Sequence, residues 1–168
     1  MQVLLNRKST KNFKPDPVPE YIIDKIIEAG LWAPSGMNRQ AGIIVAITDK
    51  ALIERLSKMN ADIMGAKMDP FYNAPCVLLV LAKKEVRTYV YDGSLVMGNM
   101  MTAAEALGVG SCWIHRAKEE FESEEGKQIL KEIGIEGNYE GIGHCVVGFP
   151  ASLPESKQRI EGRVFKVK

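Results

Sequence analysis

Residues that build metal centres and redox-active thiol sites are scarce in this sequence. Its 168 residues include two histidines and three cysteines, and neither a Cys-x-x-Cys nor a His-x-x-x-His spacing occurs. A zinc site is therefore not expected. The odd number of cysteines, each in or beside an apolar run, favours buried free thiols in a reducing cytosol. These cysteines are Cys76, Cys112 and Cys145.

A catalytic cysteine is the alternative for these thiols, and it would need a positioned histidine. His115 and His144 each lie close in sequence to a cysteine. Because neighbouring residues on a strand point to opposite faces of a sheet, this closeness is weak evidence for a catalytic pair.

Long apolar runs and a surplus of charge are also missing. No stretch approaches the roughly 18 apolar residues of a membrane span, and the N-terminus lacks the charged start and apolar core of a secretory signal. A net charge of +1 disfavours a nucleic-acid partner, since such proteins usually carry a broad basic face. We therefore expect a cytoplasmic protein that binds neither membrane nor nucleic acid.

Three common sequence motifs for nucleotide binding and hydrolysis are absent. There is no Gly-x-x-x-x-Gly-Lys-Ser/Thr loop, and the glycines over 108–110 lack the third glycine of a dinucleotide fingerprint. The Gly-x-Ser-x-Gly elbow of hydrolases is missing as well. A nucleotide-like ligand would have to be held in another way.

Hydrophobic spacing predicts alternating helices and strands within a single domain that covers residues 1–168. The pattern indicates an α/β or α+β layered fold. The segment from about 152 to 168 has no clear helical period and is expected to form a C-terminal arm. Helices are expected over 20–30, 50–59, 92–107 and 123–133, and strands over 43–47, 76–81, 110–114 and 143–147.

The helix expected over 92–107 is apolar on nearly every side. Glu105 is its only charged residue after Asp92. A helix of this kind must be covered on most sides, yet one sheet of a single domain covers one side. We therefore favour a homodimer with this helix at the interface, and the alternative is a central helix wrapped within one chain.

Positive charge is concentrated at the two ends of the chain. Residues 1–15 carry four Lys or Arg and no acid, and residues 152–168 carry five Lys or Arg against two acids. The middle of the chain, 16–151, is then −6, since the whole chain is +1. This asymmetry suggests that the two ends serve an anion.

The N-terminal cations form a compact group that can hold a phosphate. Arg7 offers a planar fork that matches a phosphate bidentately. Lys8 and Lys11 add point charges, and Ser9 adds a hydroxyl donor. An ordinary basic terminus on a solvated surface is the simpler alternative.

A second polar segment over 33–40 reads Ala-Pro-Ser-Gly-Met-Asn-Arg-Gln. Asn38 and Gln40 both donate and accept hydrogen bonds, so they can bind the edge of a polar heterocycle. Gly36 permits close backbone approach or a positive φ. The simpler alternative is a turn between a helix and a strand, where such residues are common.

The order and spacing of these motifs resemble the FMN-dependent nitroreductase family. The family's N-terminal Arg-Ser motif, its Pro-Ser-x-x-Asn-x-Gln motif and its central helix with the following strand all have counterparts here. The similarity covers nearly the whole chain. The matching segments are 7–13, 17–19, 33–40, 74–75, 99–114 and 147–150, followed by Lys157 and Arg159.

This resemblance implies an α+β sandwich with a mixed central sheet flanked by helices, formed as an intertwined dimer with FMN at the interface. The phosphate and ribityl chain would be held by Arg7, Lys8, Ser9, Lys157 and Arg159, and the pyrimidine edge by Lys11. The partner chain would contribute Pro34, Ser35, Gly36, Asn38 and Gln40. The strand-end position near the flavin N5 atom would be taken by Ile114, His115 and Arg116.

The resemblance further implies an oxidoreductase with no catalytic side chain, because the flavin N5 atom carries the chemistry. NADH or NADPH would deliver hydride and leave, and a nitroaromatic, quinone or related small acceptor would then take the electrons. The alternatives are a flavin-binding module without turnover and a family variant with other chemistry, such as flavin breakdown or dehalogenation. The basic pair at 115–116 fits anionic substrates and a solvated arginine equally well.

Overall fold

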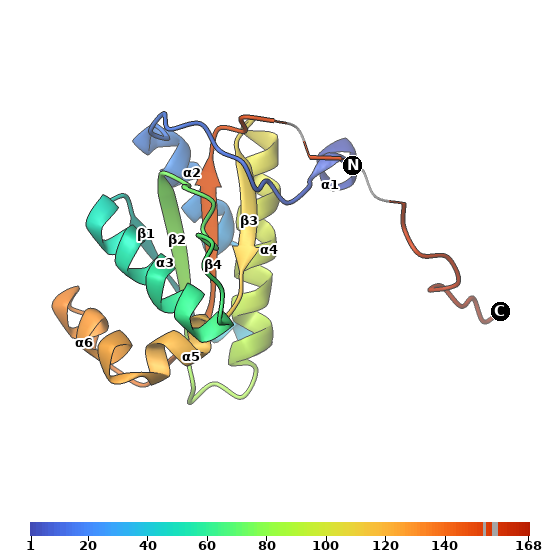
Figure 1. The fold of residues 1–168 in the computed structure, drawn as a ribbon. Coiled ribbons are helices and arrows are strands. Elements are labelled where there is room, and N and C mark those ends of the chain that lie inside the picture. Colours follow the sequence, from blue (N-terminus) through green and yellow to red (C-terminus); the bar gives the residue numbers. More distant parts are fainter. Residues whose placement is uncertain (153, 156–157) are drawn as a thin grey trace.

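In the computed structural model the chain forms a four-stranded sheet with helices on both faces (Figure 1). The structure describes residues 1–152, 154–155 and 158–168. The elements in chain order are α1 (Gln2–Asn6), α2 (Glu20–Leu31), the 3-10 turn η1 (Gly36–Asn38), β1 (Gly42–Ile47), α3 (Lys50–Met64), β2 (Cys76–Lys83), α4 (Tyr89–Ala106), β3 (Gly110–Ile114), α5 (Ala117–Glu122), α6 (Glu124–Glu132) and β4 (Tyr139–Gly148).

The strand order is β1-β2-β4-β3, and neighbouring strands run antiparallel. The α+β class expected from the sequence is confirmed. Within the described residues, the parallel component of the expected mixed sheet is limited to a one-residue bridge between Ser9 and Ser111 at the β3 edge. The N-terminal segment thus extends the sheet beyond its last strand.

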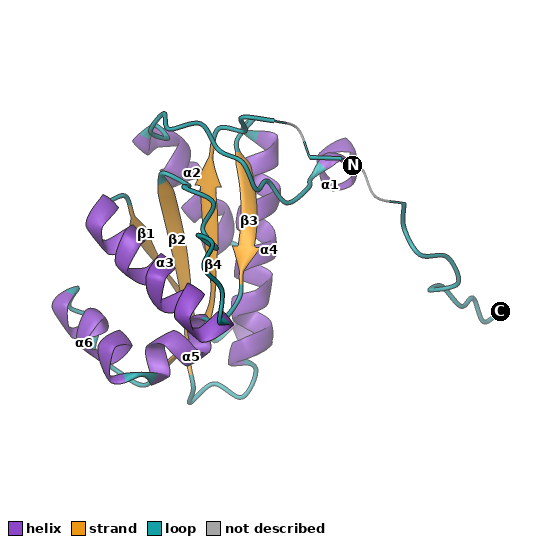
Figure 2. Ribbon diagram, in the orientation of Figure 1, coloured by secondary structure: helices purple, strands orange, loops and turns teal. Residues whose placement is uncertain are grey.

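β2 lies inside the sheet and is buried on both of its faces. Alternate residues point to opposite faces, so Val77 and Leu79 join one core, while Leu78 and Val80 join the other. The uninterrupted apolar run of this strand is what burial on both faces requires. α3, α5 and α6 cover the first core, and α2 and α4 cover the second (Figure 2).

All eight predicted elements are present, but β4 begins at Tyr139 rather than 143. Glycines interrupt the apolar pattern at its start. A Cβ at Gly141 would collide with the main chain of Ala117, and one at Gly143 would collide with the Trp113 ring. These glycines therefore make room for α5 and for Trp113. The short helices α1 and α5 were not predicted.

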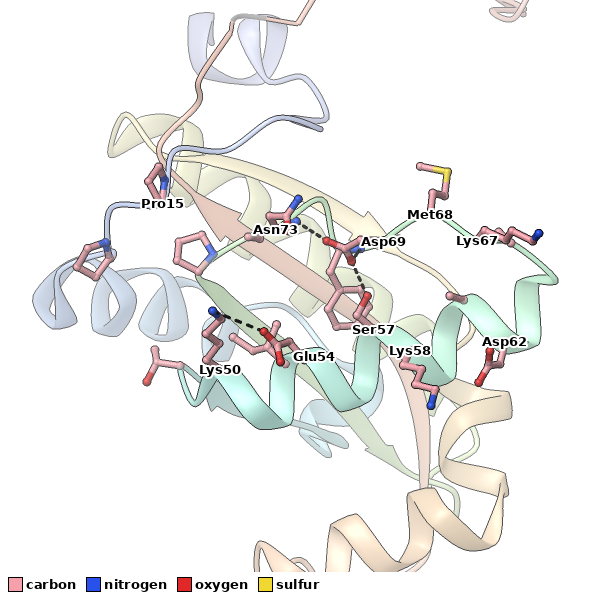
Figure 3. A pocket seen from close by; sticks show the side chains of 18 residues that line it. Pro15, Lys50, Glu54, Ser57, Lys58, Asp62, Lys67, Met68, Asp69 and Asn73 are labelled. Carbon is pink, nitrogen blue, oxygen red and sulfur yellow. Dashed lines mark hydrogen bonds and ion pairs between the residues drawn. The ribbon is translucent and has the colours of Figure 1, made fainter.

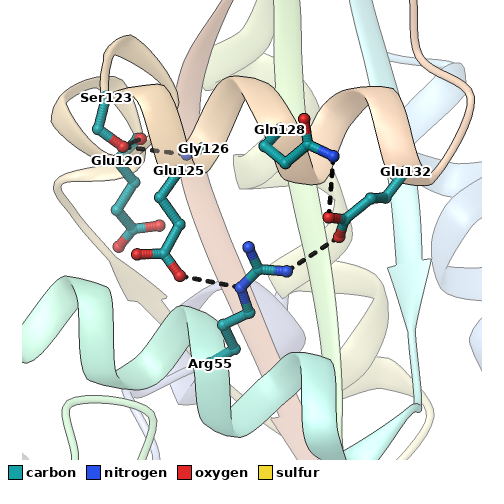
Figure 4. A network of polar contacts seen from close by, with 7 residues as sticks. All are labelled: Arg55, Glu120, Ser123, Glu125, Gly126, Gln128 and Glu132. Carbon is teal, nitrogen blue, oxygen red and sulfur yellow. Dashed lines mark hydrogen bonds and ion pairs between the residues drawn. The ribbon is translucent and has the colours of Figure 1, made fainter.

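Arg55 on α3 fixes the position of α6. Its guanidinium donates to Glu125 Oε1 and Glu132 Oε2, each at 2.9 Å (Figure 4). The hydrogen bonds to these two carboxylates raise the pKa of Arg55. Because all three side chains are partly exposed to solvent, the pairing orients the helix more than it stabilises the fold.

α4 buries one face against the sheet and leaves the opposite face uncovered in the single chain. Val96 and Met100 are buried, whereas Tyr91 and Leu95 are 73% and 45% exposed. A Cβ placed at Gly98 would have no neighbour within 4 Å. The single chain therefore does not wrap this helix on all sides. Among the described helices, none combines the length and apolar composition that a membrane crossing requires.

Candidate functional site

Residues 9–14 are anchored beside the ends of two strands. The Thr10 N–H donates to the Ser111 carbonyl at 2.9 Å, and a bridge joins Phe13 to Pro150 just beyond β4. Thr10 and Phe13 are buried, so they anchor the segment. The residues between and before them are exposed or half-buried, and they form the polar surface of this edge.

Three of the predicted site residues converge at the start of β3. Burial raises the pKa of the Cys112 thiol, while a hydrogen bond with Ser9 and the charges of Lys11 and Arg7 act in the opposite direction. The one-residue bridge between Ser9 and Ser111 holds this segment against the edge of β3, and Arg7 and Lys11 lie two residues to either side of Ser9. Lys11 Nζ also lies 5.7 Å from the centroid of the Tyr72 ring, within cation–π range. In the described part of the chain, neither Arg7 nor Lys11 has a carboxylate partner.

Lys8 lies at a neighbouring depression of about 400 Å³ that also includes Glu105 from the end of α4 and Pro154 from the tail. The tail thus passes close to the N-terminal cations. Arg159 is exposed and lies on the C-terminal arm, which extends away from the body (Figure 1), so a single chain does not bring Arg159 to Arg7. Lys157 lies outside the described residues.

The second predicted group lies at the other end of α4. The Gly36 N–H donates to Asp92 Oδ1 at 2.9 Å. The Gln40 N–H donates to Ser35 Oγ at 3.0 Å, and Gln40 Nε2 donates to Asn38 Oδ1 at 3.1 Å. These contacts form a closed turn whose tip is exposed to solvent.

This turn holds three non-glycine residues in the left-handed region. Met37, Asn38 and Gln40 have φ of 53°, 54° and 49°. Each left-handed backbone conformation costs roughly 1–3 kcal/mol of folding free energy, and it persists only where contacts with the surrounding structure hold the residue in place. Hydrogen bonds within the turn hold these residues, and Asp92 anchors the turn to α4 through the Gly36 N–H. Asp92 is 3% exposed and also accepts from Thr88 Oγ1 at 3.0 Å. In the sequence Asp92 is only a charge at the start of an apolar helix, and nothing near it indicates Gly36 as its partner.

Within one chain these two groups are separated by the length of α4. Asp92 holds the turn that includes the exposed Pro34, and Glu105 borders the depression at Lys8. The 13 positions between Asp92 and Glu105 correspond to about 20 Å of helix axis. One chain therefore does not bring all the predicted residues together.

The third group, Ile114 to Arg116, lies at the end of β3. It shares that strand with the N-terminal cations, since Ser111 and Ile114 are about 10 Å apart along it. His115 is exposed, and its carbonyl accepts from Asn60 Nδ2 at 2.7 Å. Arg116 has a φ of 78°, and its Nε donates to Asn60 Oδ1 at 3.0 Å. Asn60 was not identified from the sequence, because the helix was expected to end at residue 59, whereas α3 continues to Met64 and buries Asn60.

A cavity of about 950 Å³ lies between α3 and residues 66–75, and none of the predicted site residues lines it (Figure 3). Two of its charged groups have partners: Lys50 pairs with Glu54 at 3.7 Å, and Asp69 accepts from the Ser57 hydroxyl. Lys58, Asp62 and Lys67 also line the cavity. Because the predicted residues gather along β3 and none lines this cavity, we place the candidate site along β3.

The cysteines are buried free thiols, as expected. Burial raises the pKa of Cys76 to about 12 and raises that of Cys145 as well. His144 stacks near Phe71 in the first core, at 4.9 Å between ring centroids, whereas Cys145 belongs to the second core. The sheet thus separates this histidine from its neighbouring thiol. Within the described residues, no three His, Cys, Asp or Glu side chains converge as metal ligands would.

We expect the native protein to resist thiol labelling. Alkylation requires the thiolate, and burial both covers the sulfur atoms and raises the pKa values of the thiols. The control is urea-denatured protein, in which iodoacetamide at pH 8 should alkylate all three thiols. In the same time it should alkylate less than about one thiol per native chain. Mass spectrometry counts the adducts. Rapid labelling of native Cys112 would contradict its placement beneath the N-terminal segment.

Comparison with known proteins shows which family this chain resembles over most of its length. A family model described as the nitroreductase family matches residues 4–149. A protein of Archaeoglobus fulgidus, provisionally named an NADH dehydrogenase/NAD(P)H nitroreductase, is 28% identical over 89% of this chain and 84% of its own length. The oxygen-insensitive NADPH nitroreductase of Salmonella typhimurium is 27% identical over 95% of this chain and 69% of its own length.

Solved structures share the fold. The crystal structure of a nitroreductase from Bacteroides fragilis with bound FMN superposes with a TM-score of 0.91. The alignment covers 99% of this chain and 97% of that chain at 22% sequence identity. At this identity the likeness establishes the fold.

Proposed function

The chain belongs to the nitroreductase family, and from this premise we propose that it is an FMN-dependent oxidoreductase. NADH or NADPH serves as electron donor, and a nitroaromatic, quinone or related small molecule as acceptor. The names of the relatives and the FMN in the Bacteroides fragilis structure support this proposal. The observation that carries it is the pairing of Ser9 with Ser111, reinforced by the Thr10 N–H bond to the Ser111 carbonyl, which holds Arg7, Ser9 and Lys11 along the edge of β3.

The chemistry of these donors fits both parts of FMN. A guanidinium and ammonium groups suit a phosphate dianion, and they are available from Arg7, Lys8 and Arg159. Lys157 is assigned to the same phosphate from the sequence. Lys11, beside an aromatic ring, suits the pyrimidine edge. Bound FMN would supply a ring that accepts hydride at N5 and passes the electrons on.

The protein's own contribution is orientation and electrostatics. Lys11 stabilises negative charge at the pyrimidine edge of the ring, which grows on reduction. The turn from Ile114 to Arg116 presents main-chain N–H groups to the edge that receives hydride. No side chain is assigned an acid–base role, since water or the flavin ring itself can supply protons.

We further propose a homodimer in which each site takes residues from both chains. A two-fold axis that crosses α4 near Gly98 makes the two copies of this helix antiparallel. The Asp92 end of one helix then lies beside the Glu105 end of the other. This arrangement brings the turn over 34–40 of one chain to the cations of its partner.

The exposed apolar surface supports this arrangement. Monomeric proteins seldom expose large contiguous apolar patches. The C-terminal arm, which extends away from the body (Figure 1), exposes further apolar side chains that a partner could cover. On α1, α2 and α4 and the turn that follows α2, the exposed large side chains include Leu4, Leu5, Leu31, Trp32, Met37, Tyr91 and Leu95.

The proposed activity is tested by mixing FMN-loaded protein with NADH or NADPH without oxygen. We expect the yellow flavin absorbance to bleach with at least one donor and to return when a quinone or nitroaromatic is added. Free FMN at the same concentration is the control. Absence of bleaching with both donors would favour a flavin-binding module, and product analysis would reveal flavin breakdown or dehalogenation.

Arg159→Ala should weaken FMN binding by roughly 1.5–3 kcal/mol, because a charged hydrogen bond to the phosphate is lost. Fluorescence titration of the apoprotein with FMN measures the change. Arg163→Ala is the matched control, since this arginine lies on the same arm and its Nε donates to the Ile160 carbonyl. Equal FMN affinity in both variants would exclude Arg159 from the phosphate site.

Subunit mixing tests the shared site. Arg7→Ala and Asn38→Ala should each be weakly active alone, because each damages both sites of its own dimer. After mixing and subunit exchange, about a quarter of the sites should be intact, since half of the dimers are mixed and each has one undamaged site. No recovery of NAD(P)H oxidation after verified exchange would place both residues in a site built from one chain.

A further inference from the structure

A polar cluster is buried between α3, α5 and β4, directly behind the turn that joins β3 to α5. Its members, Asn60, Glu120 and His144, have no exposed surface. Glu120 Oε2 lies 2.5 Å from His144 Nε2, and the Asn60 amide donates to Glu120 Oε1. We call these three residues the buried cluster. Apolar side chains of similar size could fill this space without the desolvation cost, so the cluster calls for a role beyond packing.

Asn60 connects the buried cluster to the turn. Its Nδ2 donates one hydrogen to the His115 carbonyl at 2.7 Å and the other to Glu120. Its Oδ1 accepts from Arg116 Nε at 3.0 Å. Both amide hydrogens are therefore used, and two of the three hydrogen bonds go to the turn. No other described side chain holds both His115 and Arg116.

Glu120 helps to fix which way the Asn60 amide faces. The His115 carbonyl only accepts hydrogen bonds and the Arg116 Nε–H only donates, so the Asn60 oxygen faces Arg116 and its nitrogen faces His115, where Glu120 accepts its second hydrogen. Glu120 reaches from α5 toward α3 (Figure 4). On its other side it contacts His144, whose ring lies 4.9 Å from that of Phe71. The carboxylate is thus held between two helices and the sheet.

The turn needs such support, because its backbone conformation at Arg116 is energetically unfavourable. Arg116 has a φ of 78°, in the left-handed region that non-glycine residues rarely adopt. A trans peptide is planar, so the His115 carbonyl and the Arg116 N–H point in opposite directions. By binding that carbonyl, Asn60 turns the Arg116 N–H away from the buried cluster. In the described residues this N–H has no hydrogen-bond partner.

We propose that Asn60, oriented by Glu120, is a positioning residue that directs the Arg116 N–H to the hydride-accepting edge of the flavin. This proposal rests on the proposed function, because it assumes that the turn lies at N5. The phosphate contacts of Arg7 and Arg159 do not involve Asn60. A change at Asn60 therefore affects hydride transfer and the reduction potential more than it affects FMN affinity.

Asn60→Leu tests this in the full-length, FMN-loaded protein. We expect anaerobic flavin reduction by NAD(P)H to slow by at least about tenfold, since a misplaced reacting group can cost up to about a hundredfold. The midpoint potential should fall, because a hydrogen bond to the reduced ring is lost. The dissociation constant for FMN should stay within about threefold of the wild-type value, because the charged phosphate contacts remain.

Two further variants make the test decisive. Ile53→Ala removes a buried side chain from α3 two turns before Asn60 and lowers stability without touching the turn. It should leave the reduction rate and potential unchanged. Glu120→Gln preserves the size of the side chain and should slow reduction about threefold, since its amide no longer dictates the orientation of Asn60. It replaces Asn60→Leu if that variant does not fold.

The outcomes separate this proposal from the proposed function. A wild-type protein that binds no FMN, or that no nicotinamide donor reduces, overturns the function itself. An active wild-type protein with Asn60 and Glu120 variants that match Ile53→Ala in rate and potential overturns the positioning role alone. Loss of FMN affinity in parallel with loss of rate would show a general structural role and would also overturn it.

Discussion

The anchoring of residues 9–14 along the sheet edge is the constraint on which the candidate site depends. Thr10 and Phe13 enter the protein interior, and the space they occupy exists because Gly110 and Gly148 have no side chains; a Cβ at either position would collide with them. With these residues held inside, Ser9 and the adjacent cations must remain on the outer surface. A basic N-terminal segment thereby becomes an ordered group of donors.

The length of α4 is the second constraint. The helix separates the turn held by Asp92 from the cations near Glu105, so neither end forms a complete binding site by itself. At the same time its outer face is the apolar surface that an identical helix would cover. In the arrangement we propose, association of the chains and completion of the site are one event, and ligand binding then stabilises the assembly by mass action.

Much of the fold could be predicted from the sequence, because long elements carry strong periodic patterns. α2 and β3 begin and end within about a residue of their predicted limits. α5 escaped prediction because six residues rich in glutamate give too short a pattern to identify a helix. The first residues of β4 escaped because glycines there serve a neighbouring helix, which local sequence does not reveal.

The candidate site was predictable in composition but not in geometry. The family resemblance supplied the cations and amides that we assign to the candidate site. It did not identify Asp92 as the partner of Gly36, since the two are 56 positions apart, nor Asn60 as the support of a turn 55 positions later. Such pairings depend on tertiary structure, and a single sequence carries no local signal for them. The left-handed residues at 37, 38 and 40 were equally hidden, since none is a glycine.

The bare backbone at Gly98 has a consequence for how such an assembly diversifies. The distance between two packed helices depends on the side chains at their point of crossing. In the proposed symmetric dimer, Gly98 of one chain faces Gly98 of the other across the two-fold axis. One substitution at this position therefore adds a side chain on both sides of the helix crossing. Descendants of this chain could therefore widen or narrow two distant pockets together by mutating a residue that touches no ligand.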